Sequence, residues 1–180
     1  MRKSVLIAVA TVSLLGACRQ GEVPANNETP DSNVTGELSP RGGPSIMPEE
    51  AQAVFHERHE GMEAIGKSTK TIKQALDSGS PDMGAIRAAS AKIDELAGKS
   101  SGWFPAGTDK TLLPKTRALP AIWGKPDDFA AKDRDFQQAA SALKSAAEQG
   151  DVDAVRDQFA ALGKTCKACH DTYRAEKHPQ

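Results

Sequence analysis

The amino-acid sequence predicts an all-α protein built as an antiparallel four-helix bundle, and three observations lead to this prediction. Apolar residues recur at alternating steps of four and three between residues 51 and 76, which places them along one side of a helix. The stretch Glu148-Gln149-Gly150-Asp151 ends one helix and caps the next, so those two helices must run antiparallel. No segment of residues 47–180 has the alternating pattern of a half-buried strand.

Each of the four helices has a recognisable start. Pro48-Glu49-Glu50 opens the first with carboxylates in its first turn, where the helix dipole stabilises negative charge. Ser80 is the predicted cap of the second helix, with Pro81 at its first position, while Pro126 and Asp151 begin the third and fourth. The predicted inward positions are Ala51, Phe55, Arg58, Met62, Ile65, Thr69, Ile72 and Leu76, then Ile86, Ala89, Ile93 and Leu96, then Phe129, Phe136, Ala140, Leu143 and Ala147, and finally Val152, Val155, Phe159, Leu162, Cys166, Cys169 and Tyr173.

The connection from residue 100 to residue 123 is long for a compact domain. It is rich in glycine, proline and threonine, yet it also carries large apolar side chains, among them Trp103, Phe104 and Trp123. Loops of this length are usually functional, so we expect this one to serve the functional site or to pack over part of the bundle.

Residues 1–18 predict a lipoprotein signal peptide. Arg2 and Lys3 precede an apolar run at 5–15 that is too short to span a bilayer. The run ends at Leu15-Gly16-Ala17-Cys18, which resembles the lipobox of bacterial lipoproteins, where the cysteine becomes an acylated N-terminus. We therefore expect a periplasmic protein anchored to a membrane through lipid on Cys18. The alternative is an ordinary signal peptide, in which Cys18 has no such role.

The rest of the chain divides into a linker and one domain. Residues 19–46 nearly lack apolar side chains and predict a flexible linker, which leaves 47–180 as a single domain. Removing the signal peptide takes away two cations, so the formal net charge moves from −1 to −3. No basic stripe with interleaved aromatic residues is present, and we expect no nucleic-acid partner.

The sequence Cys166-Lys167-Ala168-Cys169-His170 predicts covalent attachment of one c-type haem. The two thiols lie three residues apart, as attachment to two vinyl groups requires, and the next residue offers an imidazole to the iron. A redox dithiol would not need the adjacent histidine. A zinc site would need a fourth ligand, for which only His178 lies nearby. Because both cysteines fall on the inward stripe, we expect the haem to lie inside the bundle.

Three residues of the first helix are candidates for contact with this haem. Arg58 interrupts a stripe that should be dry, and a propionate would supply the charge that a buried arginine lacks. The alternative is an arginine that extends to water or to a surface carboxylate. Met62 is a candidate sixth ligand of the iron, although methionine on such a stripe is often only core. His59 borders the stripe and is the weakest candidate, since exposure is the default for histidine.

Residues 47–180 resemble the cytochrome c′ family, the class II c-type cytochromes. The matching residues are Arg58 and Met62 in the first helix, 103–108 and 118–123 in the long loop, Phe129 at the start of the third helix, and 166–174. The resemblance implies that Cys166 and Cys169 form thioethers and that His170 is the proximal ligand. It also implies that Arg58 contacts a propionate, that Met62 is the distal residue, and that Arg117 is a further candidate contact.

The resemblance implies two functions. Members similar to the cytochrome c-556 type use methionine as a sixth ligand and carry electrons, whereas five-coordinate members bind small diatomic gases such as nitric oxide and carbon monoxide. We expect electron transfer with redox partner proteins, and gas binding as the alternative. No acid–base pair beyond His59 is available for peroxide chemistry, so we do not expect an enzyme. Relatives form homodimers through their first two helices, which makes a homodimer a further expectation.

Overall fold

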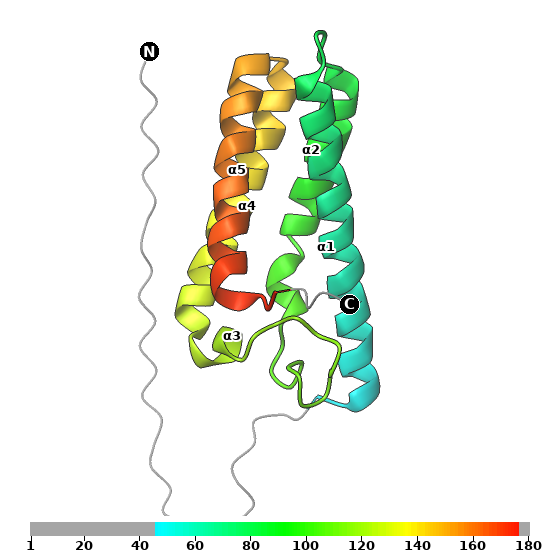
Figure 1. Cartoon of the computed structure of the whole chain (residues 1–180), viewed down its shortest axis with the longest axis vertical. Helices are drawn as coiled ribbons and strands as arrows, with labels where there is room; N and C mark the ends of the chain where they lie inside the picture. The colour runs from blue at the N-terminus through cyan, green and yellow to red at the C-terminus, as the bar shows by residue number, and fades with distance from the viewer. Residues whose placement is uncertain (1–45, 177–180) are drawn as a thin grey trace, which may run out of the picture. The chain divides into compact units, whose positions relative to one another are not determined.

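Four long helices, joined by two tight turns and one long connection, make up the described part of the chain (Figure 1). The computed structural model describes residues 46–176, and the predicted signal peptide, nearly all of the linker and His178 lie outside this range. The long helices are α1 (Pro48–Asp77), α2 (Met83–Ala97), α4 (Pro126–Gln149) and α5 (Val152–Tyr173). Helix α1 packs on α2, α2 on α4, and α4 on α5. The predicted all-α four-helix bundle is confirmed.

The two tight turns lie at the same end of the bundle, which we call the turn end (Figure 1). Asp82, not Ser80, caps α2, because its carboxylate accepts hydrogen bonds from the backbone N–H groups of Gly84 and Ala85. The predicted cap at Ser80 is therefore wrong. Gly150 ends α4 with φ of 78°, a left-handed conformation that glycine adopts without strain, and Asp151 caps α5 as predicted.

Aliphatic side chains close the core toward the turn end. The side chains of the turn-end core are at most 5% exposed: Ile72, Leu76, Ile86, Leu143, Ala147 and Val155. All six were predicted to face inward, since they fall at the positions that repeat every three or four residues. Their burial accounts for the association of the four helices at this end.

The connection between α2 and α4 crosses the opposite end, which we call the loop end (Figure 1). It contains two short helices that the sequence did not predict, η1 (Ser100–Trp103) and α3 (Ala121–Gly124). Backbone hydrogen bonds join Leu119 to Tyr173 and Ala175 to Arg117, at 2.9 Å and 2.8 Å. The connection is thereby held against the last turn of α5.

The first described residues also lie at the loop end. A Cβ at Gly107, where φ is 84°, would lie only 2.7 Å from Cγ2 of Ile46. Glycine at this position therefore allows both the turn and the close contact with the residue that leads into α1. Among residues 46–176, no helix is both long enough and apolar enough to span a lipid bilayer.

Candidate functional site

Cys166, Cys169 and His170 lie on the last two turns of α5, at the loop end. Both cysteines are free thiols, and all three side chains are partly buried. Cys166 packs against the main core cluster, as do Met62 and Phe104. Cys169 packs against a second cluster, together with Phe104 and others. The helix thus presents two thiols, three residues apart, to the apolar interior.

The local environment keeps these groups neutral. Burial, together with the positive charges of Arg174 and Arg117, lowers the pKa of His170 to about 4. Burial also raises the pKa of the Cys166 and Cys169 thiols. A neutral imidazole is the form that binds iron. Reactive redox dithiols have lowered thiol pKa values, so the raised values argue against that alternative.

The zinc alternative also lacks support in the part of the chain that the structure describes. No group of three or more histidine, cysteine, aspartate or glutamate side chains is placed there to hold a metal ion. A structural zinc site requires four such ligands around one point. Among residues 46–176, no further ligand that zinc would need lies beside the two thiols and His170, and His178 lies outside this range.

Arg58 of α1 is only 5% exposed and donates four hydrogen bonds to the connection. Nη1 donates to the Trp103 carbonyl oxygen at 3.2 Å and to Thr108 Oγ1 at 3.4 Å. Nη2 donates to the Thr108 carbonyl oxygen at 3.4 Å and to Thr116 Oγ1 at 2.9 Å. The guanidinium also lies over the ring of Phe104, 4.9 Å from its centroid. Arg58 therefore joins α1 to three points of the connection.

These contacts correct one premise of the sequence-based prediction. We expected Arg58 to lack partners unless a propionate supplied them, but Trp103, Thr108 and Thr116 already engage four of its five donors. The partners are 45 to 58 residues away in sequence, so no local pattern could reveal them. Contact between Arg58 and a propionate stays a prediction.

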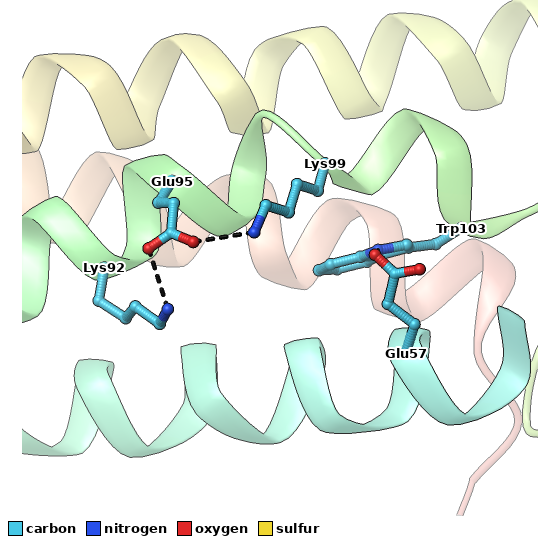
Figure 2. Close-up of polar contacts among 5 residues, drawn as sticks. All are labelled: Glu57, Lys92, Glu95, Lys99 and Trp103. Atoms are coloured by element: carbon cyan, nitrogen blue, oxygen red, sulfur yellow. Dashed lines mark hydrogen bonds and ion pairs between the residues drawn. The ribbon is translucent and has the colours of Figure 1, made fainter. Parts of the chain in front are cut away.

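Trp103, at the end of η1 in the connection, packs its ring against α1 and is 2% exposed. Its Nε1 donates a hydrogen bond to Oε1 of Glu57 at 3.2 Å (Figure 2). A Cβ at Gly61 would lie 2.4 Å from Cη2 of the indole, so only glycine lets the ring lie this close to α1. Three residues of α1 therefore contact Trp103: Glu57 binds its indole N–H, Arg58 binds its carbonyl oxygen, and Gly61 lies against its six-membered ring.

A charged triad, Lys92 and Glu95 of α2 and Lys99 just after it, lies beside this contact (Figure 2). Lys99 and Lys92 each donate a hydrogen bond to Glu95 at 2.9 Å. Hydrogen bonds from Lys99 and Lys92 lower the pKa of Glu95 to about 2. The positive charge of Lys99 is thus offset locally, at an exposed site.

Tyr173, three residues after His170, is a buried member of the second apolar cluster. It is 2% exposed, and its hydroxyl donates a hydrogen bond to Asp128 at the start of α4. Its ring packs edge-on against Phe129 at 5.2 Å between centroids. Burial and the contact with Asp128 raise the pKa of Tyr173 to about 12. The end of α5 is thereby joined to α4 beside Cys169.

The structure places the other predicted site residues in three different environments. Met62 is partly buried and packs against the same core cluster as Cys166, and its role as the distal residue stays a prediction. The His59 side chain is 61% exposed and pairs with Glu63 at 3.5 Å, so the structure does not bring it into the interior. Nε of Arg117 donates to the Ala175 carbonyl oxygen at 2.9 Å.

Comparison with known proteins places these features in one family. The model of the family described as cytochrome C′ matches residues 53–174, about two thirds of the chain. The chain belongs to the cytochrome c′ family. Cytochrome c′ of Allochromatium vinosum is 32% identical over 73% of this chain and 84% of its own length. The protein of Pararhodospirillum photometricum is 34% identical over 68% of this chain and 97% of its own.

Solved structures of the family share the fold. Cytochrome c′ from Thermochromatium tepidum is 33% identical and has a TM-score of 0.65, over 73% of this chain and 99% of its own. A shorter match, to cytochrome c-554 of Cereibacter sphaeroides, is 42% identical and spans 71 residues, about half of that relative. Relatives of both names therefore align with this chain.

The cofactor of cytochrome c′ proteins is one covalently attached c-type haem, which confirms the cofactor predicted from the Cys-x-x-Cys-His sequence. The donor set described above fits this group. Cys166 and Cys169 provide thiols three residues apart on one helix, and His170 provides a neutral imidazole beside them. Which residues hold the haem stays a prediction, argued in the next section.

Sequence reasoning missed most of the residues that support the site from around it. Thr108 and Thr116 accept hydrogen bonds from Arg58, Glu57 accepts one from Trp103, and Asp128 accepts one from Tyr173. Each contact joins segments at least 45 residues apart. The one available signal was the length of the connection, which indicated that it packs over the bundle.

Proposed function

We propose that this protein carries electrons, using one haem attached through Cys166 and Cys169 with His170 as axial ligand of the iron. The observation that carries the proposal is the placement of these three side chains together on the last turns of α5, partly buried against apolar clusters. The haem supplies an iron that alternates between its ferrous and ferric states. The chain supplies position, exclusion of water and charge.

His170 is suited to bind iron throughout the neutral pH range. Its pKa near 4 means that almost no imidazolium is present at pH 7, so no proton competes with the metal. The two cationic side chains that contribute to this shift, Arg117 and Arg174, also favour negative charge nearby, such as that of a propionate. We assign Arg117 as a candidate propionate contact on this basis.

Arg58 has one donor left for a propionate. Its four Nη hydrogens serve the connection, while no partner of Nε is found among the described residues. We therefore propose that a propionate either receives a single hydrogen bond from Nε or displaces one of the longer contacts, those at 3.4 Å to Thr108. Arg58 acts in both cases as the link between haem and connection.

Whether Met62 binds the iron distinguishes electron transfer from gas binding. As a sixth ligand, its thioether would stabilise ferrous iron and limit rearrangement during electron transfer. If Met62 only fills the core, the iron keeps an open position that suits nitric oxide or carbon monoxide. The specific observation in favour of this second candidate is a nitric oxide complex among the solved relatives, a variant of cytochrome c prime from Alcaligenes xylosoxidans at 27% identity and TM-score 0.64.

Optical and paramagnetic resonance spectra of the ferric and ferrous protein test the choice. Electron transfer through a six-coordinate iron predicts low-spin spectra with an iron–methionine charge-transfer band that a Met62→Ala variant loses. Met83→Ala is the matched control, since Met83 is partly buried in the same core cluster but lies at the turn end. High-spin spectra with rapid nitric oxide uptake, unchanged in Met62→Ala, would instead support the gas-binding alternative.

Cytochromes c′ are periplasmic, and we propose that this one is held at a membrane by lipid on Cys18. The support is the Leu-Gly-Ala-Cys sequence after a short apolar run. The mature protein is expected to begin at Cys18 and to carry acyl chains, which the mass of its N-terminal peptide measures, and a Cys18→Ser variant should carry none. A mature N-terminal peptide without acyl mass would contradict the anchor.

We propose redox partner proteins as its physiological partners, and no catalytic residue. A homodimer is the further candidate, because one solved relative, at 30% identity and TM-score 0.66, is a cytochrome c′ with ligand-controlled dimer dissociation. Analytical ultracentrifugation with and without nitric oxide tests whether this chain forms such a dimer. A single monomeric species in both conditions would contradict it.

A further inference from the structure

Asp133 is a carboxylate at an inward-facing position of α4. The apolar stripe of this helix runs through Phe129, Phe136 and Ala140, which pack in the two core clusters. Asp133 lies four residues after Phe129 and three before Phe136, where the stripe would otherwise continue with an apolar side chain. Its side chain is partly buried. The function proposed above does not use this carboxylate.

Two neighbours hold the Asp133 carboxylate in place. The hydroxyl of Ser100, a residue that is 1% exposed at the start of η1, lies within hydrogen-bond distance of Oδ1. Gln137, one turn later on α4, donates a hydrogen bond from Nε2 to Oδ2 at 2.7 Å. Among residues 46–176, no cationic side chain forms an ion pair with Asp133. The carboxylate is therefore fixed in position without a paired positive charge.

The register of the two last helices places Asp133 level with the thiols. Helices α4 and α5 are antiparallel, and Asp128 of α4 contacts Tyr173 of α5. Both helices rise by the same distance per residue. Five residues along α4 from Asp128 is Asp133, and five residues back along α5 from Tyr173 is Ala168. Asp133 is therefore at the height of the segment 166–169.

Contacts on both sides of Asp133 agree with this register. Phe129 packs in the same cluster as Cys169, and Phe136 belongs to the cluster against which Cys166 packs. Burial, followed by the negative charge of Asp133, raises the pKa of the Cys169 thiol. The carboxylate is thus close enough to Cys169 for its charge to act there.

We propose that Asp133 lowers the reduction potential of the haem by stabilising the ferric state. The proposal rests on the haem attachment and electron transfer proposed above. On reduction the iron gains one electron and loses one unit of positive charge, so a fixed negative charge nearby favours the ferric state. Lys132 and Arg174 act at Cys169 in the opposite direction, so the effect of Asp133 is measured as a difference between variants.

Spectroelectrochemical titration of the holoprotein measures this difference. Asp133→Asn removes the charge but keeps the shape of the side chain, and its amide still offers hydrogen bonds to Ser100 and to a reoriented Gln137 amide. At a fixed electrode potential near the wild-type midpoint, we expect the ratio of ferrous to ferric haem to rise about threefold to tenfold. A tenfold rise corresponds to about 59 mV for a one-electron couple.

Two further variants separate the local charge from net charge and from structure. Asp135→Asn removes the same charge from an exposed position of α4, so we expect a change below about twofold. Added salt should abolish that small change but preserve most of the Asp133→Asn effect, because partly buried charges are screened less. Ser100→Ala removes a hydrogen bond but keeps the charge. It should lower stability without raising the ratio of ferrous to ferric haem.

Failure of the electron-transfer function and failure of the Asp133 role give different results. A wild-type haem that does not cycle reversibly between its ferrous and ferric states would overturn the function. A reversible haem whose ratio rises less than about twofold in Asp133→Asn, or rises equally in Asp135→Asn or Ser100→Ala, would overturn only the role of Asp133. Circular dichroism checks folding. If Asp133→Asn does not fold, Asp133→Ser removes the same charge and should raise the ratio equally, whereas Asp133→Glu should leave it unchanged.

Discussion

The turn end and the loop end of the bundle are packed in different ways. At the turn end, aliphatic residues such as Ile72, Ile86 and Leu143 are completely buried, and the four helices need nothing else to close. At the loop end, Met62, Cys166 and Cys169 on the same inward stripes remain partly buried, and the fully buried groups include the polar side chains of Arg58 and Thr108. One end holds the bundle together, and at the other end partly buried thiols and buried polar side chains surround the proposed haem site.

The largest expected effect on stability comes from the turn end. Leu143→Ala removes a side chain with no exposed surface, so we expect a loss of about 2–5 kcal/mol in the free energy of unfolding. Because Leu143 lies away from the proposed haem residues, the loss should be equal in the haem-free and haem-containing proteins. Denaturant unfolding followed by circular dichroism measures both. A loss that depends on haem would break the distinction between the two ends.

At the loop end, Arg58→Leu leaves two carbonyl oxygens and two threonine hydroxyls without their donor. We expect a loss of about 3 kcal/mol, and a smaller one for Arg58→Lys, which keeps the charge but has fewer donors. The haem potential separates the two roles of Arg58. If Arg58→Leu leaves the potential and its pH dependence unchanged, the propionate contact is wrong, whereas the role in holding the connection stands.

Gly61→Ala tests the close approach of Trp103 to α1. The added methyl group would overlap the indole, so we expect a loss of about 1–3 kcal/mol and a shift in tryptophan fluorescence. Gly66→Ala is the matched control on the same helix, where an added Cβ meets nothing within 4 Å. The control should stabilise the protein by up to about 1 kcal/mol. Equal effects at both positions would contradict the described packing.

The smallest expected effect is at Tyr173. Tyr173→Phe removes the hydrogen bond to Asp128, and we expect a loss of about 1 kcal/mol near neutral pH. The folded protein favours the protonated phenol, whose pKa is about 12 instead of 10. Its contribution is therefore fully present below pH 10 and is lost as the pH rises toward 12. Unfolding measured across this range should show the decline in the wild type and a weaker one in Tyr173→Phe.

Sequence periodicity predicted almost all of the buried residues and helix ends at the turn end. The inward positions of α2 and α5 there, such as Ile86 and Val155, follow from spacing alone, and Gly150 and Asp151 mark the reversal between α4 and α5. Only the cap of α2 was misplaced, because the helix begins at Met83 and Asp82 is the residue next to its free N–H groups.

At the loop end, the sequence predicted which side chains could bind a haem, but not how the connection packs around them. The Cys-x-x-Cys-His sequence and the burial of Arg58 and Met62 could be inferred from local patterns. The partners of Arg58 could not, because Thr108 and Thr116 lie in an aperiodic segment whose path depends on tertiary contacts. His59 was the weakest candidate, with exposure as its default, and its side chain is exposed and lies 3.5 Å from Glu63, one turn later.

The central claim is that the last turns of α5 hold a covalent haem, and the mass of the unfolded protein tests it most directly. Protein matured in a periplasm competent for cytochrome assembly should be coloured, and its mass after acid denaturation should include one porphyrin. A variant with both Cys166→Ala and Cys169→Ala should lose the porphyrin under the same treatment. A colourless wild-type protein whose denatured mass equals that of the polypeptide alone would contradict the account.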